Sequence, residues 1–209
     1  MKILSVRDLK IPEIKVIRFE RFKDPRGYFA EHFRRSDLQS HPQTAFLRGV
    51  DFQQSNESHS RAGTIRGLHF QWNPYMGKLV RTIQGRMVDL VLDIRKGAST
   101  LGQIIAYDMP SNKSDDFNEW IWVPPGFAHG NFFTEETTIE YLCSGEYNPR
   151  CEAGISPLAS DIDWSICEPA LKKQFEGVAR DSLMTDKDRN GFTLGTWSRN
   201  EASNRFVKS

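Results

Sequence analysis

The sequence predicts an all-β fold, a jelly-roll β-sandwich or barrel with short helices and a C-terminal extension. The middle of the chain divides into short apolar stretches separated by Gly, Pro and Asn, a spacing typical of antiparallel sandwiches. Residues 87–94, "MVDLVLDI", alternate strictly: aliphatic side chains occupy positions 88, 90, 92 and 94, whereas Asp89 and Asp93 fall on the other face. "EWIWV" and "TTIEYLC" alternate in the same way, so we expect several paired strands.

The chain has 209 residues, which is long enough for one packed domain and short for two. We expect a single domain, with a jelly-roll core over about residues 12–165. Helical periodicity is confined to "PALKKQFEGVA", which starts at Pro169, and to "RRSDLQS" after Phe33. Over about residues 166–209 the strand pattern gives way to a helical or irregular, polar segment, which we expect to pack on the barrel as an extension.

Composition narrows the choice of partners. The formal charge is +1, with acids and bases mixed along the chain, so we expect no broad basic face and no nucleic-acid partner. The three cysteines form no CxxC pair and cannot all pair with one another, which favours a reducing compartment. Charges interrupt every apolar run near the N-terminus, so we expect no signal peptide, no membrane span and a cytoplasmic, soluble protein.

One predicted strand, "TIRGLHFQW" from Thr64 to Trp72, carries Arg66 and His69 among residues that favour a half-buried β-strand. Strict alternation sends these two side chains to opposite faces of the strand. A site that uses both therefore requires a bulge or a twist, which Gly67 could provide.

Other polar residues interrupt the apolar pattern, and each has a purely structural explanation when taken alone. Lys78 at a strand start is usually a solvated end, and a lone histidine such as His129 is more often a hydrogen-bonded core residue than a ligand. Tyr141 in a barrel wall is normally a core residue with a bonded hydroxyl. The segment "DPRGYFAEHF" fits a charged turn followed by an edge strand.

Two kinds of chemistry are disfavoured by residue spacing. A metal site in a barrel of this kind needs two histidines one residue apart and a nearby glutamate, but His69 is followed by Phe70 and Gln71. The cysteines form no zinc pattern, and neither GxSxG nor a cysteine-protease context marks a nucleophile. What remains is a histidine base, tyrosine acids, and lysine and arginine to stabilise an oxyanion, a set that suits proton transfer next to a carbonyl.

These residues lie in segments that resemble, in order and roughly in spacing, the signature segments of the dTDP-4-dehydrorhamnose 3,5-epimerase family. The segments are "FKDPRGYFAEHF", "QSNESHSRAGTIRGLHFQ", "GKLVRTIQGRMVDLVLDIRKGASTLGQ", "WVPPGFAHGNFF" and "YLCSGEYNP". The similarity covers about residues 12–165 and returns at "LMTDKD".

The resemblance implies a jelly roll of the cupin type that needs no metal or cofactor and acts as a homodimer on a nucleotide-linked 4-keto-6-deoxyhexose, in dTDP-L-rhamnose-type biosynthesis. It implies that His69 is the base and Tyr141 the acid, on opposite faces of the sugar. It also implies that Lys78 lies beside the keto oxygen and that Asp188 orients His69.

The residues expected to bind substrate follow from the same resemblance. Arg66 and His129 are expected to line the sugar region, and Arg26 and Glu31 to reach the nucleotide, partly across the dimer interface. The other expected ligand contacts are Phe29, Gln54, Asn56, Tyr147 and Glu152.

The chain also departs from the family pattern near the expected sugar pocket. Phe70 replaces a usual tyrosine, Met76 lies near a position that is often glutamine, and Asn131 follows Gly130 where an aromatic is usual. Three functions therefore stay open: inversion of C3 and C5, inversion of C3 or C5 alone on a related nucleotide sugar, and sugar-nucleotide binding without turnover. A base and an acid together disfavour the third, because a binding protein has no need of the pair.

Overall fold

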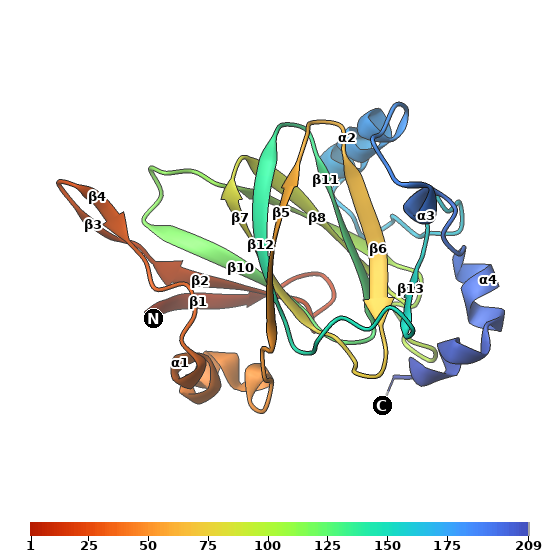
Figure 1. The fold of residues 1–209 in the computed structure, drawn as a ribbon, viewed down its shortest axis with the longest axis horizontal. Helices are drawn as coiled ribbons and strands as arrows, with labels where there is room; N and C mark the ends of the chain where they lie inside the picture. Colours follow the sequence, from red (N-terminus) through yellow and green to blue (C-terminus); the bar gives the residue numbers. More distant parts are fainter. Residues whose placement is uncertain (209) are drawn as a thin grey trace.

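A computed structural model describes residues 1–208 as two facing antiparallel sheets flanked by helical segments (Figure 1). The strands of the six-stranded sheet are, in spatial order, β1 (Ile3–Asp8), β2 (Lys15–Glu20), β10 (Phe117–Val123), β7 (Lys78–Gln84), β12 (Thr137–Cys143) and β5 (Gln54–Ser60). Those of the five-stranded sheet are β13 (Glu152–Gly154), β6 (Ile65–Gln71), β11 (Phe127–Phe133), β8 (Arg86–Asp93) and β9 (Ile104–Pro110). The predicted all-β sandwich is confirmed.

Strand β8 shows how this sheet buries both of its faces. Val88, Leu90 and Leu92 pack outward against the C-terminal segment, whereas Met87 and Val91 pack inward against residues of the facing sheet. The alternation predicted for residues 87–94 is therefore confirmed. A sheet that is covered on both sides needs apolar residues at nearly every position, which accounts for the density of aliphatic residues in this strand.

The C-terminal segment forms the outer cover of the five-stranded sheet. It contains α2 (Pro169–Ala179), α3 (Asp186–Arg189), α4 (Leu194–Arg199) and the 3₁₀ helix η2 (Glu201–Arg205), on the right of Figure 1. Helix α2 confirms the helix expected around "PALKKQFEGVA". Trp197 and Phe206 are each only 2% exposed, and the ring of Phe70 lies 4.7 Å from that of Trp197. Each such aromatic contributes about 1.5–3 kcal/mol by burial, which holds the segment on the sheet.

The helical segment of residues 35–47 packs on the outer face of the other sheet. Helix α1 (Arg35–Ser40) confirms the helix expected after Phe33, and the 3₁₀ helix η1 (Pro42–Leu47) follows it. Leu38 and Leu47 pack against Trp120 of β10.

A separate hairpin of β3 (Phe22–Asp24) and β4 (Gly27–Phe29) projects from the body of the molecule (Figure 1). None of the helices within residues 1–208 is long and apolar enough to cross a membrane.

His32 is a titratable group half-buried against the six-stranded sheet. Its Nε2 lies 3.3 Å from Nη1 of Arg81, and its ring packs edge-on against Phe19. Burial, followed by the positive charge of Arg81, lowers the pKa of His32 to about 4. The imidazole is therefore neutral at neutral pH.

We expect acid to weaken the fold through His32. The unfolded chain binds more protons than the folded chain between the ordinary pKa of 6.5 and the folded value of about 4, so the free energy of unfolding should fall as pH drops through this window. The loss should be about 1–3 kcal/mol, since solvent reaches part of the ring. Urea unfolding at about pH 7 and about pH 4.5 should show a smaller loss for His32→Phe than for the wild type. Equal losses would contradict this role.

Candidate active site

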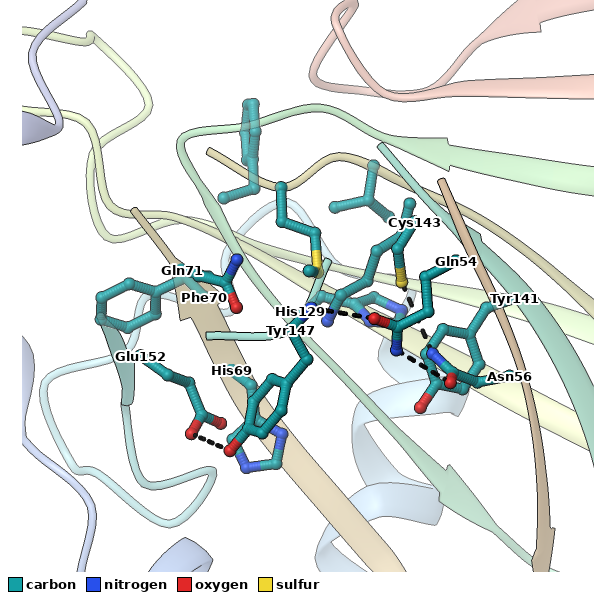
Figure 2. Close-up of a pocket in the computed structure, with 14 residues that line it drawn as sticks. Gln54, Asn56, His69, Phe70, Gln71, His129, Tyr141, Cys143, Tyr147 and Glu152 are labelled. Atoms are coloured by element: carbon teal, nitrogen blue, oxygen red, sulfur yellow. Dashed lines mark hydrogen bonds between the residues drawn. The ribbon is translucent and has the colours of Figure 1, made fainter. Parts of the chain in front are cut away.

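A cleft between the two sheets divides into two adjoining hollows that share His69, Lys78, His129 and Tyr141. The first hollow, shown in Figure 2, has a volume of about 330 Å³, and the second has a volume of about 290 Å³. Side chains that line only the first include Gln54, Asn56, Gln71, Tyr147 and Glu152. Side chains that line only the second include Ser58, Arg66, Asn131, Lys187 and Asp188.

The two sheets form opposite walls of the cleft. In the five-stranded sheet, β6 and β11 place His69 and His129 directly across from each other. In the six-stranded sheet, β7 carries Lys78 and the adjacent β12 carries Tyr141. A ligand between the walls therefore has imidazole groups on one side and a phenol and an ammonium on the other.

A bulge brings Arg66 and His69 to the same site. His129 pairs with His69 and Asn131 pairs with Arg66, so three steps along β6 match two steps along β11. Gly67 has a φ of +110°, and a Cβ there would lie 2.5 Å from the Cα of Gly130. The close approach of the strands thus requires glycine at this position. Arg66 lines the second hollow from its rim, where its Nε donates to Ser60 Oγ at 2.9 Å.

His69 is oriented by Asp188, which reaches it from helix α3. Nε2 of His69 donates to Oδ1 of Asp188 at 2.6 Å, and the backbone N–H of Gly67 donates to Oδ2 at 3.2 Å. Burial alone raises the pKa of Asp188, but the hydrogen bond and charge of His69 outweigh it and hold that pKa below the ordinary value. An ionised Asp188 keeps the proton of His69 on Nε2, which leaves Nδ1 as the basic atom.

His129 forms a second, deeper pair with Asp89 of β8. Nε2 of His129 donates to Oδ1 of Asp89 at 2.7 Å, and both side chains are almost fully buried. Burial lowers the pKa of His129 below its ordinary value even though Asp89 opposes the change. The histidine is therefore neutral and acts as a polar wall of the cleft rather than as a positive charge.

Lys78 and Tyr141 both have pKa values shifted by burial. The pKa of Lys78 is lowered, although Cys143, Asp89 and Glu152 oppose the shift. The pKa of Tyr141 is raised, so its phenol is protonated at neutral pH. Tyr141 lines both hollows of the cleft.

Hydrogen bonds also connect the residues at the mouth of the first hollow (Figure 2). The hydroxyl of Tyr147 donates to Glu152 Oε2 at 3.0 Å, and Lys187 Nζ donates to the same oxygen at 2.6 Å. Gln54 Oε1 accepts from the backbone N–H of Tyr147 at 2.8 Å and Gln54 Nε2 donates to Asn56 at 2.9 Å. These polar groups are suited to bind a polar ligand that extends outward from His69.

Three residues expected to bind substrate lie outside the cleft. Arg26 sits at the tip of the β3–β4 hairpin with 90% of its side chain exposed and pairs with Asp24. Phe29 is 66% exposed on the same hairpin. Glu31 accepts from Nε of Arg34 at 3.0 Å. None of the three lines either hollow of this chain.

The structure adds residues that the sequence analysis did not select: Ser58, Asn131, Cys143 and Lys187 line the cleft. It also adds Asp89, which is the hydrogen-bond partner of His129. The sequence did contain a signal for Asp89, because a carboxylate within an aliphatic strand needs a buried partner. Lys187 and Ser58 had none, since polar residues of this kind are ordinary in a strand or short helix. Within residues 1–208 no group of three or more His, Cys, Asp or Glu is arranged to hold a metal ion.

Two antiparallel sheets that enclose a cleft with a histidine–aspartate pair, a phenol and an ammonium define a cupin-type jelly roll suited to proton transfer. The family model described as dTDP-4-dehydrorhamnose 3,5-epimerase matches residues 8–196, so the chain belongs to this family of isomerases.

Relatives and solved structures agree with this assignment. A protein named dTDP-4-dehydrorhamnose 3,5-epimerase from Shigella flexneri is 33% identical over 192 residues, which cover 90% of this chain and 94% of the relative. The crystal structure of a dTDP-6-deoxy-D-glucose-3,5-epimerase from Legionella pneumophila, in complex with dTDP-4-keto-L-rhamnose, has a TM-score of 0.74 at 28% identity, and the match covers 91% of this chain and 93% of that one. A 3′-monoepimerase from Streptomyces bikiniensis, in complex with dTDP-quinovose, has a TM-score of 0.73 at 25% identity, with coverage of 92% and 89%.

Proposed function

We propose that this chain inverts C3 and C5 of a dTDP-linked 4-keto-6-deoxyhexose, in dTDP-L-rhamnose-type biosynthesis. The observation that carries the proposal is the placement of the His69–Asp188 pair on one wall of the cleft and of Tyr141 on the other. The names of the Shigella relative and the Legionella complex support the choice of sugar and nucleotide.

The first half of the proposed reaction removes a proton. Nδ1 of His69 takes the proton from the carbon next to the C4 ketone, and the electron pair of the broken C–H bond moves into the ring to form an enolate. The charge collects on the C4 oxygen, where the ammonium of Lys78 stabilises it by a hydrogen bond. Burial lowers the pKa of Lys78 and so brings its acidity closer to that of the enolate oxygen.

The second half returns a proton from the opposite face. Tyr141 donates its phenolic proton to the same carbon, the C4 ketone re-forms and the configuration of the carbon is inverted. Tyr141 then regains a proton from solvent and His69 loses one to solvent, so the pair is ready for the second carbon. Every group in the cycle is a side chain of the cleft, and we therefore propose that no metal or cofactor takes part.

The similarity to the Streptomyces monoepimerase favours a second candidate, inversion at one carbon only. Proton NMR of a dTDP-4-keto-6-deoxyglucose solution in D₂O, with and without a chelator, tests both. The proposal expects deuterium and inversion at C3 and C5, unchanged by the chelator. Exchange at one carbon would establish a monoepimerase, whereas binding without exchange would establish a sugar-nucleotide-binding protein and contradict catalysis.

We also propose that the chain acts as a homodimer whose sites are shared. The support is the β3–β4 hairpin, which projects from the body and carries an exposed Arg26 that reaches no hollow of its own chain. A guanidinium on such an arm can bind the diphosphate in the cleft of a second copy through paired charge-assisted hydrogen bonds.

Subunit mixing tests the shared site. Arg26→Ala should weaken substrate binding and His69→Ala should abolish turnover, because one removes a contact and the other the base. Heterodimers of the two variants should have one intact site of two and recover part of the wild-type rate at low substrate concentration. Heterodimers verified by mass spectrometry that recover no activity would show that Arg26 does not serve the other subunit.

A further inference from the structure

Asn131 lines the second hollow, and within the described residues its amide oxygen is buried without a hydrogen-bond partner. It lies on β11 two residues after His129, on the same inward face, and pairs across the ladder with Arg66 and with Asp89. Its side chain is almost fully buried at 4% exposure, and its Oδ1 has no hydrogen-bond partner within residues 1–208. A buried amide oxygen without a partner costs free energy, so this position calls for a hydrogen-bond donor that enters the hollow.

Two further acceptors lie close by in the same part of the fold. Within the part of the chain that the structure describes, Oδ2 of Asp89 is buried without a partner, because His129 binds only the other oxygen. Oγ of Ser58, which lines the same hollow, is also buried and unpartnered. A single unpartnered group in an interior is an exception, whereas two that line one hollow, Asn131 and Ser58, mark a place where a ligand completes the hydrogen bonds.

We propose that the second hollow contains a subsite that recognises a hydroxyl group of the sugar and that Asn131 determines this specificity. The inference rests on the proposed epimerase function and adds the substituent that the site selects. Around the reacting carbonyl, a 4-keto-6-deoxyhexose has a keto oxygen, a methyl group and ring hydroxyls. Only the hydroxyls carry a proton that Asn131 Oδ1 can accept, and a hydroxyl oxygen can also accept from the amide Nδ2.

The subsite therefore discriminates by leaving a buried polar group unpaired. A sugar that lacks the recognised hydroxyl leaves Asn131 Oδ1 without a donor, and the penalty persists in the transition state. Sites that pair with a substrate hydroxyl reject the analogue without it more strongly than apolar pockets reject an added methylene. We expect the wild type to lose about 10–100-fold in kcat/KM toward one of the two deoxy analogues, the 2-deoxy or the 3-deoxy 4-keto sugar nucleotide.

The test compares the wild type with Asn131→Leu, which keeps the branched shape of the side chain and replaces both polar atoms by methyl groups. Asn131→Leu should lose about 10–100-fold in kcat/KM on the parent sugar and should treat the parent and the discriminated analogue within about threefold of each other. Ser182→Ala is the matched control, because Ser182 Oγ is also buried and unpartnered but lines neither hollow. It should keep the discrimination of the wild type.

Two results would overturn the proposal. In the first, Asn131→Leu discriminates between the parent sugar and the deoxy analogue as strongly as the wild type does. In the second, the wild type turns over both deoxy analogues as well as the parent. If Asn131→Leu folds poorly, Asn131→Ser replaces it, and calorimetric binding of the parent and deoxy sugar nucleotides replaces turnover. The same experiment separates this proposal from the proposed function. A wild type that turns over no 4-keto sugar would contradict the epimerase function. A wild type that turns the sugar over without discrimination would contradict only the hydroxyl subsite.

Discussion

Replacing His69 by glutamine should lower turnover by about 10²–10⁴-fold at both carbons, because the variant loses the atom that we propose as the base. Glutamine can still bond to Asp188, so the wall of the cleft should persist and the nucleotide should bind as in the wild type. The fall should therefore lie in kcat rather than KM. Deuterium wash-in followed by NMR, with calorimetric binding of dTDP, measures both quantities.

An exposed histidine supplies the control for this variant. His59 lies on β5 of the other sheet with 55% of its side chain exposed, so His59→Gln removes an imidazole without changing a residue that lines the cleft. It should turn over substrate at the wild-type rate. If His69→Gln retained more than about a tenth of wild-type turnover, His69 could not be the base.

Replacing Tyr141 by phenylalanine should separate two events that the wild type couples. His69 can still remove a proton and return one derived from solvent to the same face, so deuterium should enter the substrate with retention of configuration. Inversion needs a donor on the opposite wall, and its rate should fall by about 10²–10³-fold. The ratio of inverted to retained deuterated sugar, measured by NMR, reports the separation.

The alternative role for Tyr141 is to position the sugar. Its ring packs with the apolar cluster between the sheets, and phenylalanine keeps that packing. A variant that lost inversion and wash-in by the same factor would indicate positioning rather than proton donation. Tyr107→Phe is a suitable control, since Tyr107 is also half-buried, lies on β9 and lines neither hollow.

The alternation of apolar and polar residues allowed most of the fold to be predicted from the sequence alone. The two faces of β8 and the span of α2 could be predicted because each side chain packs on one side of a regular element. The packing of the C-terminal segment on the five-stranded sheet could not be predicted. Trp197 and Phe206 are isolated aromatics in a polar segment, and their burial depends on where the chain passes over the sheet.

The cleft itself was predictable only in part. His69, Lys78 and Tyr141 were selected through the resemblance to a family, and the structure brings all three together. Asp188 reaches His69 across 119 residues of sequence, a contact that no local pattern contains. For Arg26 the motif implies a role that the single chain does not explain. The motif implies substrate binding, yet in this chain Arg26 lies on a projecting hairpin away from the cleft.

The central claim is that the sugar ring lies between His69 and Tyr141 with its C4 oxygen at Lys78. A crystal structure with a bound dTDP-4-keto sugar measures this directly. The account predicts that the reacting carbon has the imidazole of His69 on one face and the hydroxyl of Tyr141 on the other, with the C4 oxygen about 3 Å from Lys78 Nζ. A sugar with both groups on the same face, or with its C4 oxygen out of reach of Lys78, would contradict the mechanism.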